Sequence, residues 1–426
     1  MKRYKRCAAC IFVAAVIFTS LLCLVGCGLL SDSTVYAKVS EGIISADGFI
    51  YDLYENGEAE IVGYDGEPPC HLIIPDKLDG HAVTAIGTGA FAEDTSILHL
   101  TIGGNVCRIK TGAFKNCMTL VAVDGGEGLQ SIGDSTFADC TSLSAIAPLS
   151  AVKTVDSAAF FGCISLSTAP GAATAERIGA QAYFGCTAID SVSLSPDIKE
   201  LGDYAFGGCT SIAWAELGGL VSIPDGAFSD CTALSAVGFN KKTTHIGAKA
   251  FGGCTRLADV SVPASVRSVG VRALYGTAWL NSHTEDFVVI GRGVLISYRG
   301  EDTNVDIPSN VQVIADAFSG SEMLRAVNIG GKVRVISDYA FSGCTSLGRV
   351  EMTGKVTEIA VGAFSGCTGL SVVYLPASLK AVGKNAFYGC RNLTSVNFGG
   401  SAGKWNKIAF ADGNGSLSGV SCNTKP

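Results

Sequence analysis

The sequence has few charged residues. Charged residues make up only 16% of the chain, while glycine occurs 53 times in 426 residues. This composition excludes a charged protein of long helices and favours tight turns with short buried strands. The first 26 residues carry four basic side chains and no acidic one, so their removal would change the net charge from −7 to −11. An acidic chain argues against nucleic acid or anionic lipid as a partner.

The usual signatures of catalysis and of cofactor binding are also missing. The five histidines are scattered without a His-Glu-x-x-His motif, and no Gly-x-Ser-x-Gly marks a serine hydrolase. No glycine-rich phosphate loop or dinucleotide loop stands between a strand and a helix. The Cys-x-x-Cys spacing of a metal site occurs only at Cys7 and Cys10. We therefore predict a protein that is not an enzyme and that uses no metal or other cofactor.

The N-terminal segment has the pattern of an export signal. Basic residues from Lys2 to Arg6 precede an apolar run from Ala8 to Val25. The run ends in Leu-Val-Gly-Cys, in which the cysteine is Cys27, and this motif resembles the bacterial lipobox. The resemblance implies that the chain is cut before Cys27 and that its thiol is joined to diacylglycerol. The protein would then be lipid-anchored outside the cytoplasmic membrane of a bacterium, at the cell surface.

Two alternatives to this lipoprotein signal remain open. The apolar run is nearly long enough to be an uncleaved membrane anchor, and an ordinary secretory signal could be cut elsewhere, for example after Ala37. In the lipoprotein interpretation, residues 1–26 are the signal peptide and residues 27–46 are a short tether. The protein then contacts the membrane through the lipid anchor only, and stable anchoring needs two or more lipid chains.

A unit built on Ala-Phe-x-x-Cys returns about every 23 residues and dominates the sequence. Its aromatic position recurs fourteen times in one register, with one 22-residue step, one 44-residue step and one leucine in place of the aromatic residue. The generalised unit is L-x-x-V-x-L-P-x-x-V-x-x-I-G-x-x-A-F-x-x-C-T-x. Chance does not keep a register over that length, so internal repetition decides the fold.

Each part of the unit predicts a local structure. The Val-x-Leu alternation is typical of a short half-buried strand, and a proline or glycine then ends it. Val-x-x-Ile-Gly is a second short extended piece, and Ala-Phe-x-x-Cys is a tight or 3-10 turn that buries phenylalanine and cysteine. Because one unit cannot bury its own apolar side, units stack and their strands pair in parallel. We predict a mostly β solenoid, shaped as a rod or an arc.

The full unit resembles the repeat of the BspA-like leucine-rich repeat family of bacterial surface proteins. The beginning, L-x-x-V-x-L, is similar to that of leucine-rich repeats in general, and the 23-residue period with Ala-Phe-x-x-Cys is the specific part. The resemblance covers about residues 86 to 400. It implies a leucine-rich repeat solenoid displayed outside the cell and, for some members, adhesion or contact with a host.

The two ends and one internal segment depart from the repeat. Residues 47–85 contain two apolar stretches that predict a capping hairpin ahead of the solenoid at 86–400. Residues 401–426 predict a C-terminal cap, because a terminal coil needs a cover. An irregular insert at about 279–304 has two apolar runs around a glycine turn, as in a β-hairpin. This insert is either an irregular double coil that keeps the stack continuous or a protruding functional element.

Ten of the 17 cysteines occupy the last position of Ala-Phe-x-x-Cys. Adjacent coils place like positions about 5 Å apart, so distance alone does not exclude disulfides. Side chains in one row point the same way, however, and a metal site would need clustered ligands at shorter spacing. Buried thiols that act as small apolar core residues are the favoured interpretation. These core cysteines are Cys117, Cys140, Cys163, Cys186, Cys209, Cys231, Cys254, Cys344, Cys367 and Cys390.

The solvent side of the Val-x-Leu strands varies in residue type, and a leucine-rich repeat usually binds there. Trp214 and Tyr374 stand out because exposed aromatic residues are favoured binding anchors. Arg349 and Glu351 can pair with each other or with neighbouring coils. For each of these residues an ordinary solvated face is the alternative. The candidate binding face comprises Trp214, Glu216, Asp259, Asn328, Arg349, Glu351, Tyr374 and Asn397.

Export and a repeat solenoid together predict a function in recognition. We expect a non-catalytic binding or adhesion module whose partner is a protein or a glycan. A structural or assembly component of the cell envelope is the alternative, and an enzyme comes third.

Overall fold

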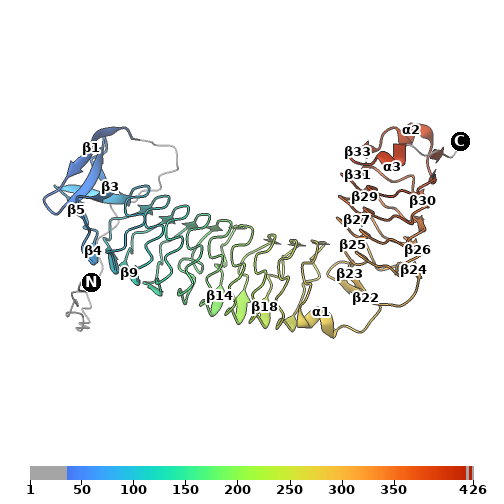
Figure 1. Cartoon of the computed structure of the whole chain (residues 1–426), viewed down its shortest axis with the longest axis horizontal. Coiled ribbons are helices and arrows are strands. Elements are labelled where there is room, and N and C mark those ends of the chain that lie inside the picture. The colour runs from blue at the N-terminus through green and yellow to red at the C-terminus, as the bar shows by residue number, and fades with distance from the viewer. Residues whose placement is uncertain (1–35, 419–421, 425–426) are drawn as a thin grey trace, which may run out of the picture.

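The computed structural model describes residues 36–418 and 422–424. The chain forms an elongated solenoid of two arms that meet at a bend (Figure 1). The first arm extends from the N-terminal strands to α1 (Ala278–Ser282), and the second begins at β22 (Phe287–Ile290). A bend of this kind was not part of the expected rod or arc.

The predicted signal peptide at residues 1–26 and its lipidation site Cys27 lie outside the described residues. In the ranges that are described, no helix is both long and apolar enough to cross a membrane.

An inner ladder of short parallel strands is formed by the Val-x-x-Ile part of each coil. It lies on the side where the two arms face each other, as the strand labels of the second arm show in Figure 1. In the first arm its strands are β8 (Arg108–Ile109), β10 (Ser131–Ile132), β12 (Thr154–Val155), β13 (Arg177–Ile178), β15 (Glu200–Leu201), β17 (Ser222–Ile223), β19 (His245–Ile246) and β21 (Ser268–Val269). In the second arm they are β25 (Val313–Ile314), β27 (Val335–Ile336), β29 (Glu358–Ile359), β31 (Ala381–Val382) and β33 (Ala409–Phe410).

An outer ladder of parallel strands is formed by the Val-x-Leu part of each coil, on the far side of both arms (Figure 1). In the first arm its strands are β4 (His71–Ile73), β7 (His99–Ile102), β9 (Ala122–Gly125), β11 (Ala145–Ile146), β14 (Ser191–Ser193), β16 (Trp214–Glu216), β18 (Ala236–Gly238) and β20 (Asp259–Val260). In the second arm they are β24 (Asn304–Asp306), β26 (Ala326–Asn328), β28 (Arg349–Glu351), β30 (Val372–Leu375), β32 (Ser395–Phe398) and β34 (Cys422–Thr424). The predicted mostly β solenoid with parallel strands is confirmed.

The turn at Ala-Phe-x-x-Cys has a conformational requirement that the sequence also carries. Bonds between residues three apart hold it, such as that from the Cys117 N–H to the Phe114 carbonyl at 3.2 Å. The second residue after the aromatic has a left-handed backbone, as at Asn116 (φ 61°) and Gly366 (φ 74°). Glycine, asparagine and aspartate adopt this conformation at the least cost. These residue types therefore recur in that slot.

The buried aromatic residues form one continuous stack in each arm. In the first arm, neighbouring rings have centroids 4.9–5.8 Å apart and nearly parallel planes. Leu274 replaces the aromatic residue in the last coil before the bend and ends that stack. A second stack runs from Phe318 to Phe387, with centroids 4.9–5.2 Å apart. Burial of one large aromatic side chain per coil contributes about 1.5–3 kcal/mol each, alongside the leucine, valine and isoleucine side chains that the same coil buries.

Beyond α1, the insert at 279–304 begins the second arm. Its hairpin consists of β22 and β23 (Val294–Tyr298), and neither ladder of the first arm pairs with it. Alternate residues of the hairpin face opposite ways, so that Val294 and Ile296 join the core of the first arm while Leu295 joins that of the second. Both faces of the hairpin are therefore buried, which explains its continuous apolar runs. The strand ladders are not continuous through this insert, and the hairpin is packed rather than protruding.

The N-terminal cover is larger than the hairpin expected at 47–85. Three antiparallel strands form a meander, so part of the tether expected at 27–46 is a strand that pairs with its neighbour. Next to it, β4 already pairs in parallel with β7, and the outer ladder begins well before residue 86. The strands of this cover are β1 (Lys38–Ile44), β2 (Phe49–Tyr54), β3 (Glu58–Tyr64), β5 (Lys77–Leu78) and β6 (His81–Ile86).

At the C-terminal end both ladders continue past residue 400. In the inner ladder β33 pairs with β31, and in the outer ladder β34 pairs with β32. Two short helices, α2 (Ala402–Trp405) and α3 (Gly415–Ser418), lie beside these strands. The segment expected as a C-terminal cap at 401–426 thus contains a further coil of the stack.

Candidate binding surfaces

Trp214 is an exposed aromatic residue on the outer ladder of the first arm. It lies on β16 with 48% of its surface exposed. Its register neighbours are Ser191 on β14 and Ala236 on β18. Because small side chains flank the indole on both sides, its surface is open to contact with a partner.

Two carboxylates lie near this tryptophan. Glu216, on the same strand, is paired in register with Gly238, where a Cβ atom would lie 2.1 Å from the Glu216 Oε2 atom. The absence of a side chain at Gly238 therefore makes room for the carboxylate. Asp259 is paired with Ala236 and is exposed.

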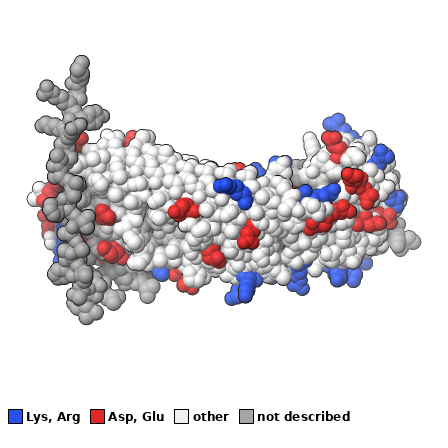
Figure 2. Space-filling view, turned by 90° about the horizontal axis from the view of Figure 1, so that it is seen from below, with Lys and Arg blue, Asp and Glu red and all other residues white. Residues whose placement is uncertain are grey.

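Figure 2 views the molecule from the side on which β14 and β18 lie in Figure 1. Long stretches of this surface are uncharged, with scattered acidic side chains. Charges of both signs are denser toward the right-hand end of the view. An exposed aromatic residue on a weakly charged surface is the composition found at the centre of many binding interfaces.

Arg349 forms a compact cluster on the outer ladder of the second arm. Its guanidinium donates a hydrogen bond of 2.7 Å to the Glu351 carboxylate. Its central carbon lies 4.6 Å from the ring centroid of Tyr374 on the next strand, a cation–π contact. Arg349 therefore pairs both within its own strand and with the neighbouring coil.

Four of the five predicted residues of the second arm share one register row. Asn328, Glu351, Tyr374 and Asn397 are paired in succession along four strands. Asp306 precedes them in the same row, although the sequence analysis did not select it. The row presents carboxylate, amide and phenol groups side by side, and these groups can form hydrogen bonds to an extended partner.

The eight predicted residues do not form a single surface. Trp214, Glu216 and Asp259 belong to a sheet of the first arm, whereas the other five belong to a sheet of the second. The bend separates the two groups. Each group is therefore a separate candidate contact surface on the outside of the solenoid.

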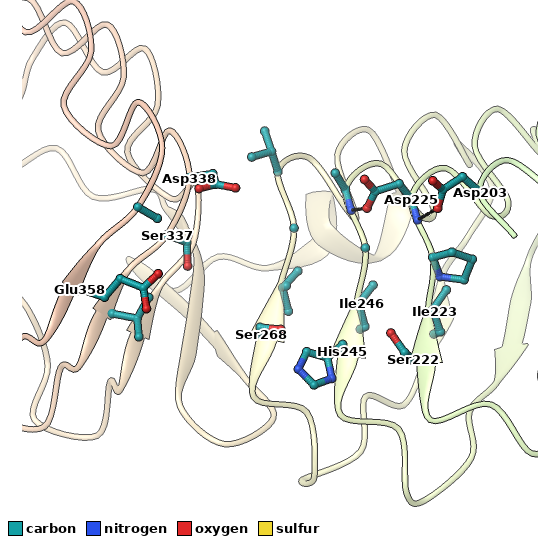
Figure 3. Close-up of a pocket in the computed structure, with 18 residues that line it drawn as sticks. Asp203, Ser222, Ile223, Asp225, His245, Ile246, Ser268, Ser337, Asp338 and Glu358 are labelled. Carbon is teal, nitrogen blue, oxygen red and sulfur yellow. Dashed lines mark hydrogen bonds between the residues drawn. The ribbon is translucent and has the colours of Figure 1, made fainter. Parts of the chain in front are cut away.

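A hollow at the inner corner of the bend is a third surface. It has a volume of about 670 Å³. One wall comes from β17, β19, β21 and the turns that follow them, and the other comes from β27, β29 and adjoining residues (Figure 3). Ser222, His245 and Ser268 lie along the first wall, and Ser337 lies on the second.

Four carboxylates line this hollow, and no lysine or arginine does. Asp203 and Asp225 belong to the first arm, while Asp338 and Glu358 belong to the second. The three aspartates each accept a hydrogen bond from a backbone N–H of the following coil, over 2.6–3.2 Å. Glu358 makes no side-chain hydrogen bond or ion pair to any described residue. This site could not be found from the repeat pattern, because its two walls meet only through the bend.

Comparison with protein-family profiles identifies the family of this chain. The profile of the family described as BspA type Leucine rich repeat region (6 copies) matches residues 73–188, 170–281 and 297–415, well over half of the chain. The chain belongs to this family. No curated protein matches the sequence.

Solved structures of bacterial leucine-rich repeat proteins are similar to this chain. A leucine-rich repeat protein from Bacteroides ovatus ATCC 8483 is 22% identical, over 86% of this chain and 98% of that one, with a TM-score of 0.47. A leucine rich cell surface protein from Faecalibacterium prausnitzii A2-165 is 21% identical, over 88% and 98% of the two chains, with a TM-score of 0.38. The T. pallidum leucine rich repeat protein is 26% identical, over 50% and 89%, with a TM-score of 0.40.

The cysteine of the BspA type repeat has a specific structural contact here. In all ten coils its thiol donates a hydrogen bond of 3.0–3.2 Å to the carbonyl of the aromatic residue one coil earlier. All ten side chains are buried and free of disulfides. Burial raises the pKa of Cys163 and of Cys209 to about 12. The thiols are thus packed in the core and hydrogen-bonded to the backbone, a role that a plain apolar residue would not fill.

A metal centre is not evident in the part of the chain that the structure describes. There, no three side chains of histidine, cysteine, aspartate or glutamate are placed together to hold an ion. The candidate sites are two outer surfaces and one hollow.

Proposed function

We propose that this protein is a non-catalytic binding module on the surface of a bacterium. Its outer ladder would contact a protein or glycan partner, and a lipid on Cys27 would hold it at the membrane. The exposure of Trp214 between two small neighbours supports this proposal most directly. An aromatic side chain of that size is costly to leave in water and is a frequent anchor in interfaces.

The two outer surfaces suit different contacts with one extended partner. The first arm offers Trp214 beside Glu216 and Asp259, and an indole face of this kind packs against apolar atoms. The second arm offers the row from Asp306 to Asn397, whose polar groups form hydrogen bonds. Because both lie on the outside of the solenoid, a partner would be bound along the convex side.

A binding screen tests this function. The purified chain would be presented to extracellular matrix proteins, bacterial surfaces and glycan arrays, and saturable binding to one of them is expected. Trp214→Ala or Tyr374→Ala should weaken it about tenfold or more, as is usual for an aromatic anchor. Tyr388→Ala is the matched control, because Tyr388 is 63% exposed but lies in a turn beside Phe387.

Two outcomes of this screen would count against the proposal. One is the lack of any saturable partner, and the other is binding that both alanine variants leave intact. Crosslinking on intact cells that captured only envelope neighbours would instead favour a structural or assembly role.

The anchor is tested separately. Mass spectrometry of the N-terminal peptide should find diacylglycerol on Cys27, and Cys27→Ser should release the protein from the membrane fraction. A mature chain that begins after Ala37 would show an ordinary secretory signal instead.

A further inference from the structure

We propose that the hollow at the bend is a second binding site, which takes a lysine- or arginine-bearing segment of a partner polypeptide. This site is distinct from the outer ladder and goes beyond the proposed function. It lies between the two arms, so its occupant would contact both of them at once.

Charge complementarity is the first argument for this occupant. Asp203 and Asp225 on one wall and Asp338 and Glu358 on the other present carboxylates from both arms. Each aspartate uses its Oδ1 atom for the bond to the backbone, which leaves the Oδ2 atom outside those bonds. Because no lysine or arginine lines the hollow, these charges are not balanced within it. A cationic group placed between the walls would be attracted from both sides.

The apolar part of the lining is the second argument. Val269, Val271 and Pro224 line the first wall, and Val335 and Ala360 line the second. Lysine and arginine combine a long aliphatic stem with a charged end, and they bury the stem against apolar surface while the charge stays near polar groups. A small inorganic cation would leave this apolar lining without a contact.

The size and shape of the hollow are the third argument. A volume of about 670 Å³ falls within the range of about 300–1,000 Å³ that is usual for sites that bind a compact ligand. The hollow is an open corner between two strand ladders rather than an enclosed cavity. A segment of a chain can therefore enter and leave it without unfolding either arm.

The test uses the full chain purified in mild detergent and a fluorescent peptide of alternating lysine and glycine. Fluorescence anisotropy should report saturable binding that weakens as salt is added, since exposed charge pairs are screened. A glutamate–glycine peptide of the same length should not bind. Glu358→Gln should weaken binding about two- to fivefold, the usual size of one exposed charge pair. Ser222→Arg, which places a cation in the hollow, should reduce binding by more.

These variants are chosen because they spare the folded structure. Glu358 and Ser222 are exposed, whereas the three aspartates bind the backbone of the next coil and are left intact. Glu127→Gln is the matched control, since it removes one exposed carboxylate several coils away from the hollow. Circular dichroism spectra and melting temperatures of all variants should equal those of the wild type.

Several results would overturn the assignment. These are the absence of binding, equal losses in Glu358→Gln and Glu127→Gln, or complete displacement of the peptide by an equal concentration of spermine. Trp214→Ala should leave this binding unchanged, so that failure of the outer surface and failure of the hollow are told apart.

Discussion

The backbone N–H of Arg272 donates a hydrogen bond of 2.7 Å to the carboxylate of Asp316, and this bond spans the bend. In the preceding coil the equivalent N–H, that of Lys249, donates to the Val271 carbonyl of the next coil. No regular coil follows Arg272, so the side chain of Asp316 takes the place of the missing carbonyl. One side chain of the second arm thus completes the last turn of the first.

Removal of this carboxylate should loosen the bend. Asp316→Ala leaves the Arg272 N–H without its acceptor, and we expect a loss of about 1–3 kcal/mol in the free energy of unfolding. Asp316→Asn keeps an acceptor oxygen and should lose less. Urea denaturation measures the stabilities, and small-angle X-ray scattering should show a broader distribution of distances between the arms in the alanine variant. Identical scattering and stability for all three proteins would contradict this role.

The same residue should give the stability a pH dependence. Burial raises the pKa of Asp316 above its ordinary value of 3.8, so the folded state keeps a proton that the unfolded state has lost. The favourable contribution is complete below 3.8 and is lost as the pH rises through the raised pKa. The stability of Asp316→Asn relative to the wild type should therefore increase between acidic and neutral pH. Melting temperatures measured in parallel over that range test the sign.

Tyr183 replaces phenylalanine in the buried stack of the first arm, and its hydroxyl has a specific partner. The hydroxyl donates a hydrogen bond to the Pro170 carbonyl within a coil that lacks an outer strand. Tyr183→Phe keeps the ring but leaves that carbonyl without its donor, and we expect a loss of about 1–2 kcal/mol. Chemical denaturation measures it. Tyr388→Phe, at an exposed position, is the control and should be neutral.

The coil was predictable from sequence because each of its features repeats. The alternation in Val-x-Leu identifies the outer strands, and the recurrence of phenylalanine and cysteine at one slot identifies the core. The left-handed slot after the aromatic residue was not predicted, although Asn116 and Gly366 belong to a set of glycine, asparagine and aspartate that recurs there. When glycine, asparagine and aspartate recur at one slot of a repeat, they indicate a left-handed backbone at that slot.

The bend and its hollow were not predictable in the same way. The apolar runs of β22 and β23 indicate a hairpin. The direction of the bend, however, depends on how the two faces of this hairpin pack against the separate cores of the two arms. Arg272 and Asp316 occupy the same slot of two coils 44 residues apart, but the repeat does not show that the insert brings these two coils into contact. Asp306 was not selected, although Asn304 to Pro308 carries the pattern with which the chain rejoins the repeat.

The cysteines of the repeat should be unreactive in the folded protein. Their thiols are buried and donate to backbone carbonyls, so a reagent in solution cannot reach them. Iodoacetamide at neutral pH should modify the exposed Cys70 and leave the ten repeat cysteines unmodified until the protein is denatured. Peptide mass spectrometry identifies the modified positions. Rapid alkylation of Cys209 in the native state would contradict the packing described for this row.

Alkaline pH should destabilise the solenoid through the same thiols. Burial raises the pKa of Cys163 and Cys209 from 9.0 to about 12, so the folded state retains protons that the unfolded state releases above about pH 9. The stability that this provides is complete below the unfolded pKa and is lost as the pH rises toward the folded one. Melting temperatures should therefore fall steeply above about pH 9.

A Cys163→Ala, Cys209→Ala double variant should start from a lower melting temperature, because two hydrogen bonds and some packing are lost. Its decline with pH should nevertheless be shallower than that of the wild type, since two of the titrating groups are gone. Parallel slopes for the two proteins would show that other groups, such as lysines and exposed tyrosines, cause the alkaline transition.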